Sequence, residues 1–334
     1  MEYGIWCLPV TDLRKEQLQR WLNEIKEPSY ELIALNGDAS LRRYFRYGSK
    51  IAVDAPPQSQ KNLEFITIAK ALKAQGIKVP NIYNYDLSEG FLLLEDLGST
   101  LFSDVAVGDK EDFYYLKTIP VLMHLAKLDC KALPAFDKDF ILFELSLFPE
   151  WMLNKTFNMT LSKGENSLLN DSFNKLALLC NEQEQIAMHR DFHSRNLMLT
   201  DNKLAVIDFQ DMVKGPLCYD LASLLFDCYK VLPKDLIEKM TQEAFTGYKA
   251  LGFIKNKTLD EFKTDLIAVS LQRHLKVLGI FCRLKLRDHK DGYIKDLPRV
   301  LNYALEESSY LPGFSDLYEF LNLKVKAKIH SLCQ

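Results

Sequence analysis

The chain has 334 residues, with 42 lysines and arginines against 45 aspartates and glutamates, a formal net charge of -3. This length suits two lobes of ordinary domain size, and the balanced charge gives no broad electrostatic reason to expect nucleic acid or an anionic membrane as a partner. Seven scattered cysteines without a Cys-x-x-Cys pair, no signal pattern at the N-terminus and no apolar run that could span a bilayer predict a cytoplasmic protein.

The first hundred residues predict a small lobe rich in strands. Residues 30–55 read as short strands broken by turn residues. Residues 62–76 carry apolar side chains at helical spacing and end at Gly76, where a helix would stop. Two further strands flank a turn at residues 87–90, so the lobe should close near residue 97.

Helical periodicity dominates the remainder of the chain. Thr258 and Glu261 have the spacing of a capping box, which predicts a long helix that follows directly, over residues 259–288. We therefore expect an α+β, two-lobed fold: a β-rich N-lobe with one main helix over residues 1–97, and a larger, mostly helical C-lobe over 98–334.

One segment in the C-lobe, "MHRDFHSRNLMLTDNKLAVIDFQD" at residues 188–211, carries the chemistry. Asp191 could accept a proton from an acceptor hydroxyl, while Asn196 and Asp208 offer the hard oxygens that Mg²⁺ prefers. Two short strands around residues 201–203 would fold back and bring Asp208 next to Asn196. Each of these features alone could be an ordinary polar turn or surface residue, but together they indicate metal-assisted phosphoryl transfer.

The segment resembles the kinase-like phosphotransferase superfamily, in particular its aminoglycoside and choline kinase branch. A protein kinase would next show a long activation segment. Here only a short run that includes Gly215 and Pro216 separates Asp208 from Asp220. The resemblance implies that Asp220 fixes the backbone of the catalytic loop; the alternative is an acid favoured by a helix N-terminus.

The resemblance also implies nucleotide contacts in the N-lobe. A phosphate-covering loop would lie between two strands, although a plain hairpin turn explains the same residues. The hinge that meets the adenine edge would follow the last strand. The implied residues are Gly37, Asp38, Ala39 and Ser40 for the loop and Glu95, Asp96 and Leu97 for the hinge.

The chain departs from the kinase pattern on the third strand, where Asp54 stands in place of the phosphate-binding lysine. A carboxylate there would repel phosphate unless a cation intervened. Arg42 or Arg43 could supply the charge, and we take Arg43 as the candidate; a solvated basic cluster is the alternative. Glu64 would be the partner of that cation or a surface residue.

Six short sequence stretches, given at the end of this paragraph, make the family resemblance more specific. They are similar to the bacterial anomeric sugar kinases that phosphorylate N-acetylmuramate and N-acetylglucosamine at C1 during cell-wall recycling, and the likeness runs from about residue 30 to 310. It implies ATP, Mg²⁺ and a small sugar acceptor. The stretches are "GDASLRRYFR", "VDAPP", "GFLLLEDLG", "FELSLFPEW", "HRDFHSRNLM" and "LQRHLKVLGIFCRL".

The acceptor would lie over the catalytic loop, against helices of the C-lobe. Glu144, Phe148 and Trp151 form a stripe at helical spacing that would suit a sugar, although such stripes are more often core. The remaining candidates lie in the loop, after Asp208 and on the long helix, where a solvated face is the alternative. The full set of acceptor candidates is Glu144, Trp151, His193, Arg195, Asp211 and Arg273.

Two other functions stay open. The chain could phosphorylate another small hydroxyl compound, such as an aminoglycoside or choline, whose positive charge would favour an acidic pocket. It could also be a pseudokinase that binds nucleotide without turnover, a hypothesis that Asp54 motivates and that Asp191, Asn196 and Asp208 oppose.

Overall fold

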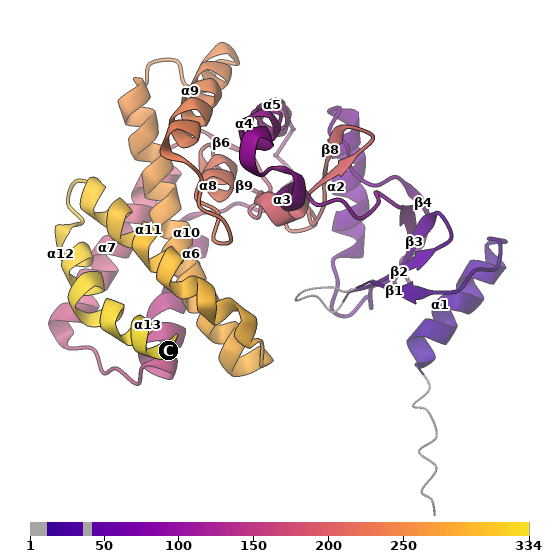
Figure 1. Ribbon diagram of the computed structural model, residues 1–334, viewed down its shortest axis with the longest axis horizontal. Coiled ribbons are helices and arrows are strands. Elements are labelled where there is room, and N and C mark those ends of the chain that lie inside the picture. The colour runs from indigo at the N-terminus through magenta and orange to yellow at the C-terminus, as the bar shows by residue number, and fades with distance from the viewer. Residues whose placement is uncertain (1–11, 36–41, 334) are drawn as a thin grey trace, which may run out of the picture.

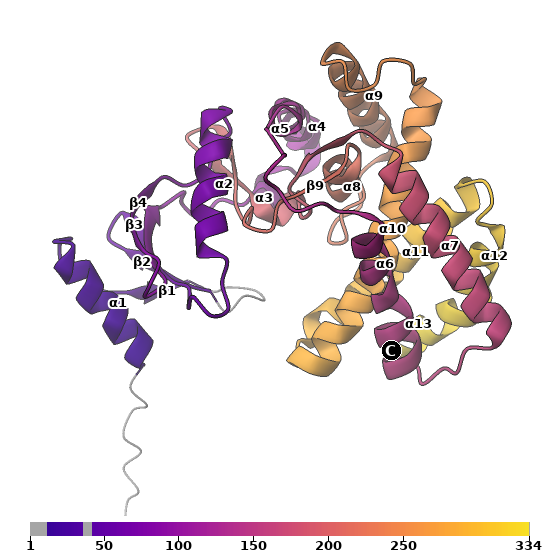
Figure 2. The same ribbon diagram turned by 180° about the vertical axis from the view of Figure 1, so that it is seen from behind.

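The structure is a computed structural model that describes residues 12–35 and 42–333. Figures 1 and 2 show a small part built around a sheet and a larger helical part beside it. The elements of the small part are α1 (Leu13–Glu24), β1 (Ile33–Ala34), β2 (Arg43–Tyr47), β3 (Lys50–Asp54), α2 (Asn62–Ala74), β4 (Ile82–Asp86) and β5 (Phe91–Glu95).

The five strands form one antiparallel sheet in the order β1-β2-β3-β5-β4. The helix predicted over residues 62–76 is confirmed as α2, and the turn predicted at 87–90 joins β4 to β5. Gly76 and Gly90 both have positive φ, +78° and +76°, a conformation that glycine adopts without strain. A Cβ on Gly90 would also lie 2.1 Å from the carbonyl oxygen of Ala55.

The strands lie between α1 and α2, so each helix covers one face of the sheet (Figure 2). Because side chains alternate along a strand, neighbours in sequence belong to opposite faces. Ala52 packs in the cluster that contains Trp21 of α1, whereas Val53 packs in the cluster that contains Phe65 of α2. The sequence analysis did not predict α1, which begins with the side chain of Asp12 accepting a hydrogen bond from the Lys15 amide.

The larger part is mostly helical, with two short strand pairings among the helices. Its helices are α3 (Phe102–Val105), α4 (Glu111–Leu116), α5 (Thr118–Ala126), α6 (Lys138–Leu147), α7 (Lys163–Asn181), α8 (Tyr219–Leu225), α9 (Lys234–Ala250), α10 (Leu259–Asp288), α11 (Leu297–Tyr310), α12 (Ser315–Phe320) and α13 (Lys326–Leu332). Its strands are β6 (Gln185–Met188), β7 (Leu197–Thr200), β8 (Lys203–Val206) and β9 (Val213–Pro216), and β6 pairs with β9 and β7 with β8. The 3₁₀ segments are η1 (Gly108–Lys110), η3 (Ser194–Asn196) and η4 (Asp291–Asp296), and the π-helical ones are η2 (Phe148–Thr156) and η5 (Leu321–Val325). The α+β class and the two-lobed arrangement are thus confirmed.

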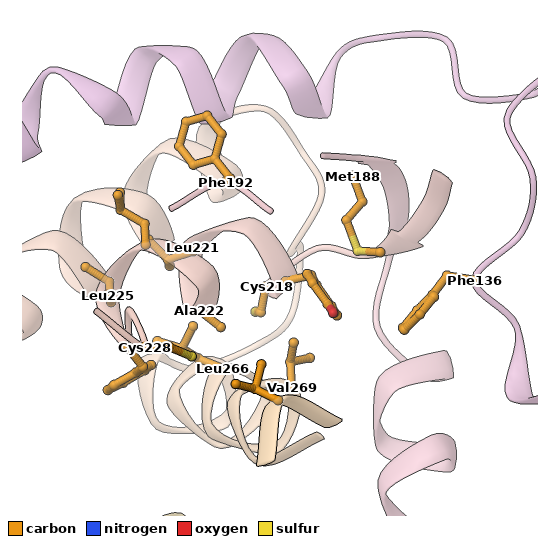
Figure 3. Close-up of a cluster of buried hydrophobic side chains, with 14 of the residues drawn as sticks. Phe136, Met188, Phe192, Cys218, Leu221, Ala222, Leu225, Cys228, Leu266 and Val269 are labelled. Carbon is orange, nitrogen blue, oxygen red and sulfur yellow. The ribbon is translucent and has the colours of Figure 1, made fainter. Parts of the chain in front are cut away.

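The long helix α10 is the centre of this part, and its predicted bounds and Thr258–Glu261 capping box are confirmed. It is buried without interruption from Ala268 to Gly279, including charged residues. The idea that Arg273 and the following His274 form a solvated face is therefore wrong. Figure 3 shows apolar side chains of α10, α8 and the catalytic loop gathered in one cluster, the floor of the site described below. Among the described helices, none combines the length and apolar character needed to cross a membrane.

Close packing of α10 against the junction of α6 and η2 gives a test of the fold. A Cβ on Gly279 would lie 2.3 Å from the carbonyl carbon and oxygen of Leu147, whereas a Cβ on Gly164 in α7 meets nothing within 4 Å. We expect Gly279→Ala to lower the free energy of unfolding by roughly 1–3 kcal/mol through overpacking. Gly164→Ala is the matched control and should stabilise by up to about 1 kcal/mol. Thermal unfolding of both variants checks this, and an equal rise in melting temperature would contradict the packing.

Candidate active site

The catalytic loop starts where β6 ends, and a buried carboxylate holds its first turn. Asp220, on the first turn of α8, accepts hydrogen bonds from the backbone N–H groups of His189 (2.7 Å) and Arg190 (3.0 Å). His189 Nε2 lies 2.9 Å from the carbonyl oxygen of Ile207 and donates to it. Arg190 has a φ of +77°, so the loop needs these bonds to keep a strained turn. The positioning role implied for Asp220 is confirmed.

A second buried carboxylate, Asp227, holds the middle of the loop. It is fully buried and accepts from the backbone N–H (3.1 Å) and the hydroxyl (2.6 Å) of Ser194, and from the Tyr229 amide (2.8 Å). The sequence analysis missed it. The signal was an acid inside the apolar run "YDLASLLFDCY", because a carboxylate in such a run must find donors.

The end of the loop brings the two candidate metal ligands next to Asp191. The side-chain amide of Asn196 donates through Nδ2 to the carbonyl oxygen of Asp191 (3.0 Å). The predicted hairpin is confirmed as β7 and β8, and the Ile207 amide donates to the carbonyl oxygen of Asn196 (3.1 Å). Asp208, the next residue, is exposed and has a φ of +63°. The fold thus gathers Asp191, Asn196 and Asp208 at one loop.

This donor set suits a hard divalent cation. With Nδ2 of Asn196 used as a donor, Oδ1 is the atom that the amide can offer, and the carboxylate of Asp208 supplies a second oxygen. The described residues contain no cluster of three or more His, Cys, Asp and Glu side chains that could hold a metal. Mg²⁺ fits two protein oxygens, because it keeps water and phosphate oxygens for its other positions.

Positive charge lies beneath the loop and fixes the state of Asp191. Burial alone would raise the pKa of the Asp191 carboxyl, but the charges of Lys276 and Arg190 outweigh it and hold the pKa below its ordinary value. Lys276 is itself buried and stays charged: burial lowers the pKa of its ammonium group, but Glu144 first, with Tyr219 and Asp191, outweighs burial and raises the pKa. Asp191 is therefore an ionised carboxylate at neutral pH, as a proton acceptor must be.

Glu144, an acceptor candidate, belongs to this buried network. Its Oε1 lies 2.7 Å from Arg190 Nη2 and 3.5 Å from Lys276 Nζ, and its Oε2 accepts from Gln272 (3.1 Å). The structure therefore does not bring Glu144 and Trp151 together as one exposed platform. The Trp151 ring is half-buried with Lys155 Nζ 3.5 Å from its centre.

The other acceptor candidates lie in three places. Arg273 is buried below the loop and donates to the Ser223 hydroxyl (2.8 Å). His193 and Arg195 contact one ring: the His193 ring meets Tyr229 edge-on at 5.4 Å, and the Arg195 guanidinium lies 3.7 Å from its centre. Asp211 forms an ion pair with Lys61 of the small part (2.7 Å).

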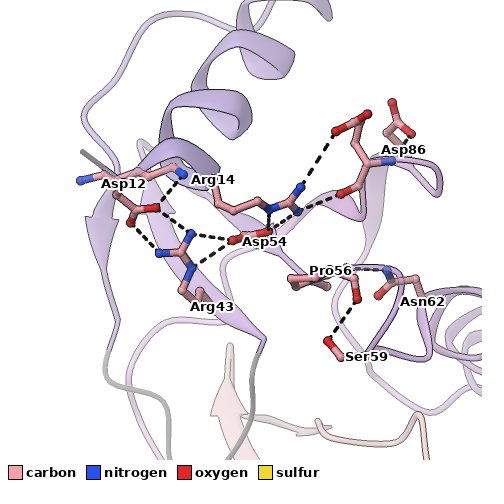
Figure 4. Close-up of polar contacts among 11 residues, drawn as sticks. Asp12, Arg14, Arg43, Asp54, Pro56, Ser59, Asn62 and Asp86 are labelled. Atoms are coloured by element: carbon pink, nitrogen blue, oxygen red, sulfur yellow. Dashed lines mark hydrogen bonds and ion pairs between the residues drawn. The ribbon is translucent and has the colours of Figure 1, made fainter. Parts of the chain in front are cut away.

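Arg43 lies on the α1 face of the sheet, away from the residues just described (Figure 4). Its guanidinium pairs with Asp12 (2.5 Å) and with Asp54 (2.6 Å), and Arg14 of α1 also binds Asp54. Register explains this, because Arg43 is opposite Asp54 in the β2–β3 ladder. The carboxylate that the sequence analysis set against phosphate is buried among arginines on the other face.

Arg42, one residue earlier, lies on the α2 face. Its side chain is buried, lies 4.9 Å from the Phe65 ring and reaches Asn62 of α2 (3.3 Å). It also donates to Gln210 (3.4 Å), which in turn donates to Asp208 (2.9 Å). Of the two arginines, Arg42 is the one that the structure brings to the candidate metal ligands. Glu64, further along α2, is exposed.

The hinge candidates end β5, and their side chains are engaged by the chain itself. Glu95 binds Lys78 (2.5 Å) and the Asn81 amide (3.0 Å). Asp96 binds Arg46 of β2 (2.6 Å), and Leu97 is buried. The loop candidates Gly37, Asp38, Ala39 and Ser40 lie outside the described residues.

Solved structures share this fold at low sequence identity. A choline/ethanolamine kinase family protein from Mesorhizobium loti aligns with 93% of this chain and 99% of its own, at a TM-score of 0.64 and 12% identity. The GDP complex of aminoglycoside 2'-phosphotransferase-IIIa aligns with 89% of this chain and 98% of its own, at a TM-score of 0.62 and 14% identity.

Curated relatives are closer in sequence. The N-acetylmuramate/N-acetylglucosamine kinase of Pseudomonas putida is 32% identical over 330 residues, 94% of this chain and 97% of that protein. The protein of the same name from Neisseria meningitidis is 33% identical over 319 residues, 92% of this chain and 95% of that protein. The model of the phosphotransferase enzyme family matches residues 31–254, which include the sheet and α2 of the small part, the catalytic loop and both buried aspartates. On the strength of this match and of its full-length relatives, the chain belongs to the phosphotransferase enzyme family.

Proposed function

We propose that the protein is an ATP-dependent sugar kinase that transfers the γ-phosphate of ATP to the anomeric C1 hydroxyl of N-acetylmuramate or N-acetylglucosamine. The geometric observation that carries the kinase chemistry is the position of Asp191, on a loop that two buried aspartates hold, beside Asn196 and Asp208. The acceptor comes from the names of relatives that align over more than nine tenths of the chain.

In the proposed reaction the acceptor oxygen forms a bond to the γ-phosphorus, and the bond from that phosphorus to the bridging oxygen of ADP breaks. Asp191 orients the acceptor hydroxyl and takes its proton. Its low pKa makes it a weak base, which suits phosphoryl transfer because the hydroxyl proton leaves late, when little nucleophile activation is needed.

Asn196 and Asp208 would hold Mg²⁺, which neutralises charge on the phosphates when it is bound. Arg42 supplies the further positive charge that a lysine provides in other kinases. Its placement supports this role, because it lies on the α2 face and reaches Gln210, the partner of Asp208. Burial raises the pKa of the neighbouring Tyr44 phenol, the charge of Arg42 opposes the rise, and Asp208 adds to it, so all three groups share one electrostatic environment.

We propose separate roles for the two lobes. The N-lobe, residues 1–97, would bind the nucleotide, and residues 98–334 would carry the catalytic loop and bind the acceptor. Because the carboxylates of Glu95 and Asp96 are held by Lys78 and Arg46, the hinge would meet adenine through its backbone groups. A cytoplasmic location suits a donor such as ATP and the unpaired cysteines of the described chain.

The acceptor can be tested directly. Purified protein with ATP, Mg²⁺ and either sugar should yield a sugar phosphate whose phosphorus NMR signal couples to the anomeric proton, because the phosphate is on C1. Choline and an aminoglycoside complete the panel as cationic acceptors. A phosphate on another carbon would overturn the C1 assignment, and turnover of the cationic compounds alone would favour that other class of kinase.

Replacing the base separates an active kinase from a pseudokinase. Asp191→Asn keeps the shape of the side chain but cannot take the proton, so we expect kcat to fall roughly 10²- to 10⁴-fold. ATP affinity, measured by calorimetry, should change little. Asp171→Asn, on the exposed face of α7, is the matched control. Unchanged turnover in Asp191→Asn would rule out its role as base.

Arg42, just before β2, and Arg43, its first residue, form a matched pair whose side chains lie on opposite faces of the sheet. We expect Arg42→Gln to raise the KM for ATP about tenfold, because a charge-assisted contact to phosphate is lost. Arg43→Gln should lower the melting temperature, since Asp54 loses a partner, without that change in KM. A larger rise in KM for Arg43→Gln than for Arg42→Gln would contradict the assignment. Melting temperatures of both variants distinguish a binding effect from unfolding.

A further inference from the structure

A hollow of about 430 Å³ opens beside the catalytic loop. The start of α3, the turn η3 of the loop and the segment after α8 form its walls. The loop forms a tight turn here. The backbone N–H of Asn196 donates to the carbonyl oxygen of His193 (3.0 Å), and the Asn196 side chain donates to the backbone carbonyl oxygen of Asp191. The hollow therefore borders the part of the loop that directly follows Asp191, the residue that would receive the acceptor's proton. The residues that matter below are Ser103, Asp104, Ser194, Arg195, Tyr229 and Lys230.

Arg195 presents a cation whose position is fixed by stacking. Its guanidinium carbon lies 3.7 Å from the centre of the Tyr229 ring. That ring is itself held, because its backbone N–H donates to the buried Asp227 and the ring packs against His193 and Phe281. A guanidinium stacked in this way keeps its N–H edge available for a planar bidentate partner such as a carboxylate.

Of the two positively charged side chains that line the hollow, Arg195 is the one available to bind a ligand. Lys230 also lines the hollow, but its ammonium group pairs with Glu111 (2.5 Å) and donates to the carbonyl oxygen of Ala106. Asp104, on the α3 wall, accepts from the Ser103 hydroxyl (3.2 Å). Within residues 12–35 and 42–333, no carboxylate forms an ion pair with Arg195, which is exposed.

The two proposed acceptors differ in one group. N-acetylmuramate carries a lactyl ether, and therefore a carboxylate, where N-acetylglucosamine has a hydroxyl. The Arg195 guanidinium, backed by the Tyr229 ring on the catalytic loop's side of the hollow, suits the first sugar and gives nothing specific to the second. A cationic acceptor would gain nothing from Arg195.

We propose that Arg195, backed by Tyr229, binds the carboxylate of the lactyl group, so that this hollow is an anion subsite that favours a sugar acid over a neutral amino sugar. The inference rests on the proposed function. It makes Arg195 a specificity residue and distinguishes its role from those of Asp191, Asn196 and Asp208, which act on either acceptor.

The test compares two substrates in one variant. Arg195→Met keeps an apolar stem over Tyr229 and removes the charge, and Arg195→Lys keeps the charge without the fork. We expect the ratio of kcat/KM for N-acetylmuramate to that for N-acetylglucosamine to fall on the order of tenfold or more in Arg195→Met, and less in Arg195→Lys. Arg287→Met, at the exposed end of α10, removes a guanidinium outside the hollow and should leave the ratio unchanged.

Each other result decides against a stated part of the proposal. An unchanged ratio, or equal losses for both sugars, would overturn the subsite. A rise in the KM for ATP without a change in the ratio would assign the hollow to the nucleotide instead. If the wild-type protein phosphorylates N-acetylglucosamine but not N-acetylmuramate, the subsite is wrong and the kinase assignment stands. If it phosphorylates neither sugar, the proposed function fails and the subsite with it.

Discussion

The catalytic loop depends on two buried carboxylates that accept hydrogen bonds from its backbone. Asp220 binds the first turn and Asp227 binds the middle, and each takes two or more donors. A loop with a residue at positive φ, such as Arg190, would relax without such partners. Both acids come from α8 and the segment that follows it, and α8 packs on α10. The geometry of the reacting groups is thus set by the helical core and not by the loop's own sequence.

The same core sets the charge at the site. Arg273 and Lys276 lie on the buried face of α10, and Glu144 and Arg190 complete the network above them. A buried charge is costly unless it is paired, and here each is either paired or hydrogen-bonded to a neighbour such as Ser223 or Tyr219. The network keeps Asp191 ionised in spite of its burial. Glu144, chosen from the sequence as a sugar ligand, has both carboxylate oxygens engaged within this network.

Much of this could be read from the sequence, because it depends on local pattern. The capping box at Thr258 and Glu261, the stop at Gly76 and the hairpin after Asn196 are all short-range signals, and each is confirmed. The sequence also determines which side chains of the first sheet lie beside one another. A two-residue turn at Gly48 and Ser49 pairs Tyr47 with Lys50, and counting back from it puts Arg43 opposite Asp54. A motif match at Asp54 does not use this register, which places Arg43 beside Asp54, on the face away from the Arg42 side chain.

Other features could not be read, because they join elements far apart in the chain. No sequence pattern around Lys276 predicts that its charge acts on Asp191, which lies 85 residues earlier in the chain. The two parts of the molecule also meet through such contacts. Phe65 of α2 stacks on Phe209 at 4.8 Å, Arg42 reaches Gln210, and Lys61 pairs with Asp211. These three contacts hold the segment that contains Asp208 against the α2 side of the small part. A displacement of α2 would therefore move Asp208 relative to Asn196, which is fixed to the catalytic loop, and would change the separation of the two oxygens proposed to hold Mg²⁺.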